Sequence, residues 1–263
     1  MNLDLTGYNV LVCGSTQGIG LATAKELASL GADLILVARN EGRLMKAIDE
    51  LPNNGEQKHH YIVADFSFPP ELRLRVEEHI KVLKNPVHIL VNNTGGPPGG
   101  PVSDAKPDEF VKAFTHHLIC NQLLVQTVLS GMKAAEYGRI INVISTSVKQ
   151  PIPGLGVSNT VRGAVANWAK TLAGEVGQYN ITVNNVLPGA TNTQRLTQII
   201  ENKSAKTGKS QEEVLQAMSD QVPMKRVAEP EEIANVIAFL ASPAASYING
   251  INVPVDGGRT ACL

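Results

Sequence analysis

The amino-acid sequence predicts a single α/β domain built on a parallel sheet of about seven strands. Short apolar runs alternate along the chain with longer segments in which apolar residues recur at helical spacing. Two strands that are connected through a helix lie parallel in one sheet, and such crossovers are almost always right-handed. The chain has 263 residues and no recognisable linker, so residues 1–263 suit one domain. The predicted strands are 10–13, 33–38, 60–64, 87–91, 140–144, 181–187 and 250–255.

The composition argues against nucleic-acid and membrane partners. The formal net charge is -1 and the pI is about 6.6, which gives no electrostatic attraction to polyanions. No apolar segment approaches the roughly 18 residues that a membrane helix needs. Cys13, Cys120 and Cys262 are odd in number and far apart, which suggests neither a disulfide framework nor a zinc site. We therefore expect a soluble, unprocessed, cytoplasmic protein without a metal site.

A glycine-rich turn follows the first predicted strand and precedes a helical pattern. Glycines let the backbone turn tightly and approach a pyrophosphate, which then sits at the helix N-terminus. The alternative for such a turn is an ordinary tight connection without a ligand. A nucleotide site here predicts a Rossmann-type, doubly wound sheet. Its expected binding residues are Gly14, Ser15, Gln17, Gly18, Ile19 and Gly20.

Several motifs resemble those of the short-chain dehydrogenase/reductase family. The turn at 14–20, Asp65, and the sequence N-N-T-G at 92–95 occur in the order typical of that family. Further resemblance is found in N-N-V-L-P-G at 184–189, in 226–242, and in V-D-G-G at 255–258. Cys13 and Thr94 replace a threonine and an alanine. The resemblance covers nearly the whole chain and implies a carbonyl reductase similar to the 3-oxoacyl-(acyl-carrier-protein) reductases.

The cofactor that this resemblance implies is NADP(H) rather than NAD(H). An acid at the end of the second strand usually accepts from the ribose of NAD, but Arg39 stands there and offers a guanidinium for a 2′-phosphate. The alternative is that Arg39 is a solvated loop cation. The resemblance places Asp65 and Phe66 beside the adenine. It places Asn92 and Gly95 beside the ribose, and Pro188, Gly189 and Thr193 beside the nicotinamide.

The catalytic positions that the resemblance implies are mostly substituted. The family uses an Asn, a Ser, and a Tyr and Lys spaced Y-x-x-x-K. Here Ser145 matches the serine, Ser158 and Arg162 occupy the Tyr and Lys positions, and His117 occupies that of the Asn. An aliphatic hydroxyl is a far poorer acid than a phenol, and an arginine stays charged, so it holds ribose hydroxyls without relaying a proton.

The proton donor is left open by these substitutions. His117 is a candidate acid because imidazole titrates near neutrality, but His116 and His117 are equally compatible with a helix at a subunit contact. Lys149 is a second candidate if it is desolvated, the alternative being a solvated loop lysine. Bound water is a third.

Three further segments bear on the substrate and on assembly. The Gly/Pro-rich loop at 95–101 is expected to shape one rim of the pocket, and 194–222 resembles the family's helical substrate lid. In the family, helices corresponding to 107–135 and 157–178 commonly pair with a second subunit, which predicts a homotetramer or homodimer.

The leading hypothesis is an NADP(H)-dependent oxidoreductase that interconverts a small-molecule carbonyl and an alcohol, with an atypical proton donor. One alternative is a catalytically impaired nucleotide-binding protein that acts as a sensor or structural subunit. Another is a non-redox enzyme on the same scaffold.

Overall fold

The computed structural model, which describes residues 1–262, contains one seven-stranded sheet in the order β3-β2-β1-β4-β5-β6-β7. Every neighbouring pair of strands is parallel. This confirms the predicted α/β, doubly wound fold. The strands are β1 Asn9–Cys13, β2 Asp33–Ala38, β3 His60–Val63, β4 Val87–Asn92, β5 Gly138–Val143, β6 Ile181–Pro188 and β7 Asn252–Val255.

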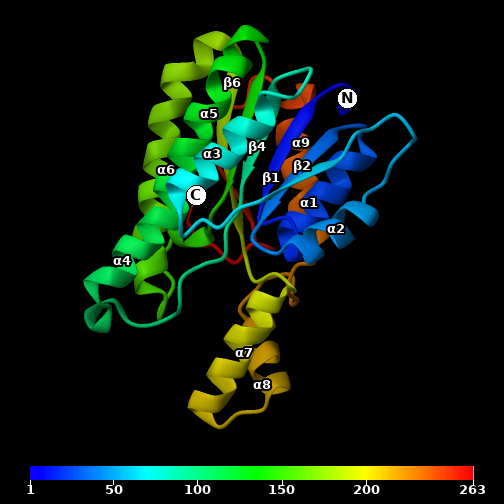
Figure 1. The fold of residues 1–263 in the computed structure, drawn as a ribbon. Helices are drawn as coiled ribbons and strands as arrows, with labels where there is room; N and C mark the ends of the chain where they lie inside the picture. The colour runs from blue at the N-terminus through cyan, green and yellow to red at the C-terminus, as the bar shows by residue number, and fades with distance from the viewer. Residues whose placement is uncertain (263) are drawn as a thin grey trace.

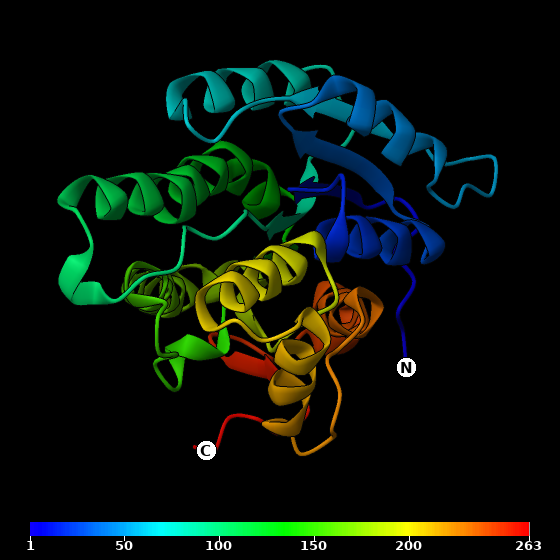
Figure 2. The same cartoon turned by 90° about the horizontal axis from the view of Figure 1, so that it is seen from below.

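Helices cover both faces of the sheet, and this explains why its central strands are apolar along their length. Helices α1, α2 and α9 pack on one face, and α3, α5 and α6 pack on the other (Figures 1 and 2). Strands buried on two faces carry apolar residues continuously rather than alternately. The helices are α1 Gly18–Ser29, α2 Glu41–Asp49, α3 Pro69–Ile80, α4 Pro107–Phe114, α5 Cys120–Ala134, α6 Gly156–Val176, α7 Gln194–Thr207, α8 Gln211–Asp220 and α9 Pro230–Ala241. Within residues 1–262, none is both long and apolar enough to cross a membrane.

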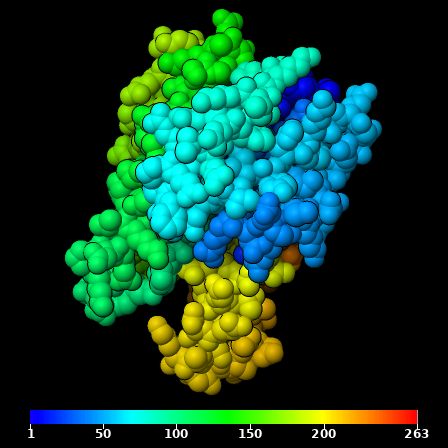
Figure 3. Space-filling view, viewed as in Figure 1, coloured from blue at the N-terminus to red at the C-terminus, as the bar shows by residue number. Residues whose placement is uncertain are grey.

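Helices α7 and α8 lie beyond the carboxyl end of the sheet, outside both helical layers (Figures 1 and 2). The space-filling view shows them as a lobe that projects from the body, and a recess separates this lobe from the one that contains α4 (Figure 3). Together they occupy the segment 194–222. The substrate side of such a sheet is its carboxyl end, so this lobe stands where a ligand enters.

The helical segment predicted for 107–135 is interrupted by a π turn at Thr115–Ile119, between α4 and α5. A π turn inserts one extra residue into a helix and shifts the side chains that follow, and such turns are frequent at functional sites. Here the turn contains His117, which is 2% exposed, whereas its neighbours His116 and Leu118 are only half-buried.

A row of asparagine side chains crosses four strands, from the last residue of β4 to the first residue of β7. The Nδ2 of Asn92 donates to Asn142 Oδ1 at 2.9 Å, and Asn142 Nδ2 donates to Asn185 Oδ1 at 2.9 Å. Asn185 Nδ2 donates in turn to Asn252 Oδ1 at 2.8 Å. These residues are direct partners in the strand register, so the amides form a continuous ladder from β4 to β7. The ladder couples the strands directly beneath the ligand side of the sheet.

Replacement of Asn142 by leucine should break this ladder while leaving a side chain of similar size. Asn92 Nδ2 and Asn185 Oδ1 would lose their partners, and each buried unpaired group costs about 1–3 kcal/mol. We therefore expect Asn142→Leu to lower the free energy of unfolding by roughly 2 to 5 kcal/mol in urea titrations. Asn202→Leu, at an exposed position on α7, is the control and should change it by less than about 0.5 kcal/mol. Equal stability of the two variants would contradict a structural role for the ladder.

Candidate active site

The glycine positions in the turn between β1 and α1 leave no room for a side chain. Gly14 and Gly18 have φ values of +60° and +54°, and a methyl group on Gly14 would lie 2.6 Å from the carbonyl oxygen of Asn93. A methyl group on Gly20 would collide with the carbonyl of Gly14. Helix α1 has no acidic residue in its first turn, and Gln17 makes no side-chain cap, so the backbone N–H groups there are free to bind an anion. This geometry fits a pyrophosphate.

Two arginines, not one, lie beside this turn. Arg39 follows β2, as predicted, and its side chain is exposed. Arg43 lies in the first turn of α2, where its backbone N–H donates to Asn40 Oδ1 and its Nη1 donates to Gln17 Oε1 at 3.3 Å. Arg43 was not predicted from the sequence. A signal for it was available, because it is a second arginine shortly after the end of β2, four residues beyond Arg39.

The other predicted nucleotide contacts also lie at the carboxyl ends of their strands. Asp65 and Phe66 follow β3, and Asp65 Oδ1 accepts from the Ser67 backbone N–H at 2.8 Å. This hydrogen bond is the main cause of the lowered pKa of Asp65, with Arg39 and His116 contributing. The carboxylate is therefore ionised at neutral pH. Asn92, by contrast, donates a hydrogen bond from Nδ2 within the asparagine ladder, and its buried Oδ1 has no partner.

The segment that follows β6 lies against the glycine turn. A methyl group on Gly18 would lie 3.0 Å from Thr193 Cγ2, which shows how closely Thr193 approaches the turn. Thr193 also caps α7, since its hydroxyl accepts from the Leu196 N–H. Gly189 follows Pro188 and packs against the backbone of Asp256, where a methyl group would lie 2.8 Å from the Asp256 Cα. Thr193 therefore joins the nucleotide side of the site to the first residue of the lobe. Gly95 is exposed, and nothing lies within 4 Å of a methyl group placed there.

Ser145 is held in place by a short 3₁₀ turn at Thr146–Val148. Its Oγ accepts from the Ser147 backbone N–H at 3.1 Å, which fixes the side chain and leaves the hydroxyl proton free to be donated. Ser145 lies two residues beyond the last residue of β5, on the ligand side of the sheet. A donor at this place suits the oxygen of a carbonyl group.

Arg162 is a buried cation that binds the backbone of β5 two residues before Ser145. It is 7% exposed, and its Nη1 donates to the carbonyl oxygen of Val143 at 2.9 Å. Burial, followed by the charge of Arg195, lowers the pKa of Arg162 to about 10, so the group remains charged at neutral pH. Ser158 lies one helical turn earlier on α6 and is half-buried. Residues 1–262 provide no hydrogen-bond partner for its hydroxyl.

His117 faces the same region but is not charged. Its Nδ1 lies 2.5 Å from Thr94 Oγ1, and its Nε2 is buried without a partner. Burial, then Arg162 and then His116, lower the pKa of His117 to about 2. The structure therefore favours a neutral, hydrogen-bonding imidazole over proton donation by an imidazolium ion. Thr94 stands where the family motif has an alanine. The structure gives a physical reason for this substitution, because the Thr94 hydroxyl forms a hydrogen bond with His117.

Lys149, the other candidate donor, lies at the end of the 3₁₀ turn and is half-buried. Its ammonium group has no hydrogen-bond or ion-pair partner among residues 1–262. Over the same residues, no cluster of His, Cys, Asp and Glu side chains is arranged to hold a metal ion.

Arg195 is a further cation at this site that the sequence analysis did not single out. It lies in the first turn of α7, and its Nη2 donates to the carbonyl oxygen of Pro97 at 2.6 Å. The predicted pocket rim at 95–101 is thereby joined to the lobe. No local pattern could have found Arg195, because its significance comes from two segments that are far apart in the chain.

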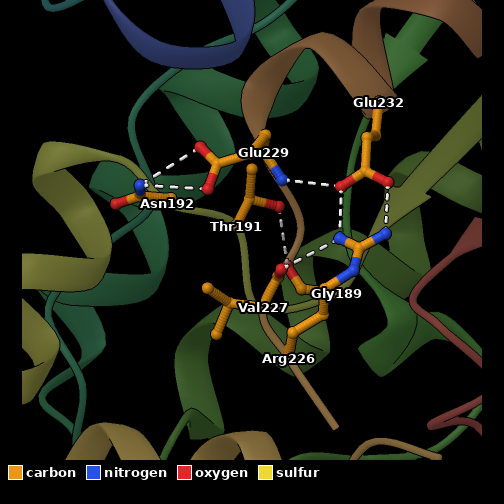
Figure 4. Close-up of polar contacts among 7 residues, drawn as sticks. All are labelled: Gly189, Thr191, Asn192, Arg226, Val227, Glu229 and Glu232. Carbon is orange, nitrogen blue, oxygen red and sulfur yellow. Dashed lines mark hydrogen bonds and ion pairs between the residues drawn. The ribbon is translucent and has the colours of Figure 1, made fainter. Parts of the chain in front are cut away.

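The two connections between the lobe and the body are bonded to each other. Thr191 and Ala228 form a parallel bridge, and Asn192 N–H donates to the Ala228 carbonyl at 2.8 Å. Figure 4 shows the side chains around this hinge, where the Asn192 amide contacts both carboxylate oxygens of Glu229. Arg226 binds Glu232 through two hydrogen bonds of 2.6 Å. The hinge is therefore a defined structure rather than a pair of loose linkers.

Known proteins resemble this chain over nearly its whole length. A family model described as Enoyl-(Acyl carrier protein) reductase matches residues 14–260. The 3-oxoacyl-(acyl-carrier-protein) reductase FabG of Pseudomonas aeruginosa is 34% identical over 258 residues, covering 97% of this chain and 98% of the relative. The NADPH-dependent reductase BacG of Bacillus subtilis is 29% identical over 247 residues, covering 94% and 95%.

Among solved structures, L-sorbose reductase from Gluconobacter frateurii complexed with NADPH and L-sorbose has a TM-score of 0.93 and 31% identity. The alignment covers 100% of both chains. The predicted NADP(H) preference agrees with the cofactor named for these relatives.

The neutrality of His117 should appear as a pH dependence of stability. In the unfolded chain a histidine binds protons near pH 6.5, whereas in the folded protein the pKa is about 2. The unfolded state therefore binds more protons below pH 6.5. The contribution of neutral His117 to the free energy of unfolding is fully present above that pH. It is lost as the pH drops toward 2, by about 1.4 kcal/mol per pH unit.

His117→Asn should remove this component. Between about pH 7.5 and about pH 5.5, the wild type should lose about 1.4 kcal/mol more unfolding free energy than the variant. Urea titrations at both pH values measure it. Identical losses in the two proteins would mean that His117 is protonated in the folded state.

Proposed function

Because the chain belongs to the short-chain dehydrogenase/reductase family, we propose that it is an NADPH-dependent oxidoreductase that interconverts a carbonyl and an alcohol. The observation that carries this proposal is the position of Ser145, whose hydroxyl proton is free at the carboxyl end of β5. A buried cation, Arg162, binds the same strand end two residues earlier. A serine donor and a fixed positive charge together stabilise negative charge that develops on a carbonyl oxygen.

The residues for NADPH surround the glycine turn. Free N–H groups at the start of α1 suit the pyrophosphate, and the 2′-phosphate is assigned to Arg39 and Arg43, which offer two guanidinium groups beside the turn. Asp65 and Phe66 are assigned to the adenine. The ribose and nicotinamide are assigned to Gly95, Pro188, Gly189 and Thr193.

Reduction of a carbonyl requires a hydride at carbon and a proton at oxygen, and bound NADPH supplies the hydride. In our proposal Ser145 donates a hydrogen bond to the carbonyl oxygen, and Arg162 stabilises the alkoxide that forms. The proton reaches that oxygen from water or from Lys149, because Ser158 is a weak acid and His117 is neutral. His117 contributes a hydrogen bond through its unpaired Nε2. Helices α7 and α8 act as the substrate lid.

A nucleotide-binding protein without redox turnover is the second candidate. One observation favours it. Ser158, Arg162 and His117 stand at the Tyr, Lys and Asn positions, and none of these three side chains titrates near neutral pH. Ser158 and Arg162 retain their charge state throughout the physiological range, and the pKa of His117 is about 2. Such a protein would bind NADPH without oxidising it.

NADPH oxidation in the presence of ketones and 3-oxoacyl thioesters separates the two candidates. The wild type should oxidise NADPH with at least one of these compounds, and less well with NADH. Ser145→Ala should lower kcat by about 100-fold or more because one donor to the developing oxyanion is lost. Its dissociation constant for NADPH, measured by fluorescence titration, should stay unchanged.

Ser29→Ala, at an exposed position at the end of α1, is the matched control and should retain full activity. Tight binding of NADPH without turnover of any compound would favour the second candidate.

We also propose that α4, α5 and α6 form a subunit interface in a homodimer or homotetramer. Val111 and Ile119 are 65% and 41% exposed on the outer side of α4 and the π turn, which leaves apolar surface uncovered. The thiols of Cys13, Cys120 and Cys262 are all free, which fits the reducing cytoplasm that we propose as the location.

The assembly is tested by light scattering coupled to size exclusion. The wild type should elute as a dimer or tetramer, and Val111→Glu combined with Ile119→Glu should shift it to a smaller species. Val82→Glu, at a 79% exposed position after α3, should leave the mass unchanged. A monomeric wild type would exclude this interface.

A further inference from the structure

Arg162 on α6 and Arg195 on α7 approach each other in front of Gly96. A methyl group placed on Gly96 would lie 3.9 Å from Arg162 Nη2 and 4.0 Å from Arg195 Nη2. No other atom of a non-adjacent residue comes within 4 Å of that point. The two Nη2 atoms are thus separated by less than the sum of these distances, and the space that a side chain of residue 96 would occupy lies open beside them.

The free edge of Arg162 faces this space. Its Nη1 is engaged by the Val143 carbonyl, while Nε and Nη2 lie along the other edge of the planar group. Nε is buried and has no partner, and Nη2 makes no hydrogen bond with any residue in 1–262. An arginine edge with two parallel N–H donors matches the two oxygens of a carboxylate.

The region also lacks a counter-charge. Neither guanidinium forms an ion pair with an acidic side chain in residues 1–262. Arg195 adds to the burial that lowers the pKa of Arg162, so the two cations repel each other. The hydrogen bond from Arg195 to the Pro97 carbonyl holds it in this position nevertheless. A buried charge without a partner is unfavourable, and an anion between the two groups would remove the repulsion.

We propose that the space bounded by Gly96, Arg162 and Arg195 binds a carboxylate of the substrate. This inference rests on the proposed function and makes it narrower, because the substrate would then be an oxo acid or its hydroxy acid rather than a neutral ketone. Arg162 receives the carboxylate along its Nε–Nη2 edge, and Arg195 adds a donor from the lid helix. Substrate binding would thereby join α6, the loop at 95–101 and α7.

A phosphate of the cofactor is the other oxyanion that could reach these arginines. The glycine turn already offers free N–H groups for the pyrophosphate, and Thr193 rather than Arg195 contacts that turn. The Pro97 carbonyl directs Arg195 toward the pocket rim. These contacts assign the arginine pair to the substrate, and the experiment compares both sources directly.

The test measures binding of three small oxo acids, acetoacetate, 2-oxobutanoate and levulinate, and of their methyl esters. Ligand-observed NMR at matched ionic strength gives the dissociation constants with and without saturating NADP⁺. At least one acid should bind about tenfold or more tightly than its ester, since charge-assisted pairs are the stronger hydrogen bonds. Arg195→Gln should reduce that preference to about twofold or less. Arg195→Lys should restore only part of it, because the charge is kept and the fork is lost.

Lys84→Gln, which removes one exposed positive charge remote from the site, is the control and should keep the full preference. Arg195 is chosen over the buried Arg162 so that folding is preserved. Equal binding of acids and esters, or no binding of any acid, would overturn the proposal. So would an Arg195→Gln variant that loses affinity for NADP⁺ by the same factor as for the acid, since the arginine would then belong to the cofactor. Failure of the wild type to bind NADP⁺ would instead contradict the proposed function.

Discussion

The candidate site depends on one buried hydrogen bond, from Arg162 Nη1 to the carbonyl oxygen of Val143. It fixes a cation that is 7% exposed at the end of β5, where both Ser145 and the asparagine ladder lie. A charge removed from water requires partners, and the protein provides only this carbonyl within residues 1–262. The remaining edge of the guanidinium is thus available to a ligand. The same charge adds to the burial that lowers the pKa of His117.

In this arrangement, charge stabilisation and proton delivery are divided among the side chains differently from the way the family's Tyr–Lys pair combines them. A phenol tuned by a lysine both stabilises charge and delivers a proton, whereas a guanidinium only stabilises charge. Proton delivery must then be separate from charge stabilisation in this chain. A permanent cation, a serine donor and a neutral imidazole form a site whose charge state changes little around neutral pH. Such a site suits an anionic substrate, whose own charge compensates the cations.

Two parts of the structure surround the site: the sheet, which forms its floor, and the projecting lobe of α7 and α8. The amide ladder from Asn92 to Asn252 ties four strands of this sheet together. The lobe of α7 and α8 is joined to this floor through the bridge between Thr191 and Ala228 and through the bonds around Glu229. Because both connections are bonded to each other, movement of the lobe would occur as a unit. Arg195 is placed at its near end, in contact with the Pro97 carbonyl.

The sequence by itself determined the α/β fold and the glycine turn, and it predicted four catalytic positions, three of them substituted, because these follow from local periodicity, glycine spacing and motif order. It also predicted Arg39, since a cation replaces an acid at one strand end. Only the tertiary structure decided that His117 is neutral, because its pKa depends on burial and on Arg162. Likewise, the pairing of Thr94 with His117 and the approach of Arg195 to Arg162 join segments that are distant in the chain. Side-chain contacts and burial are set by packing, and no local pattern encodes them.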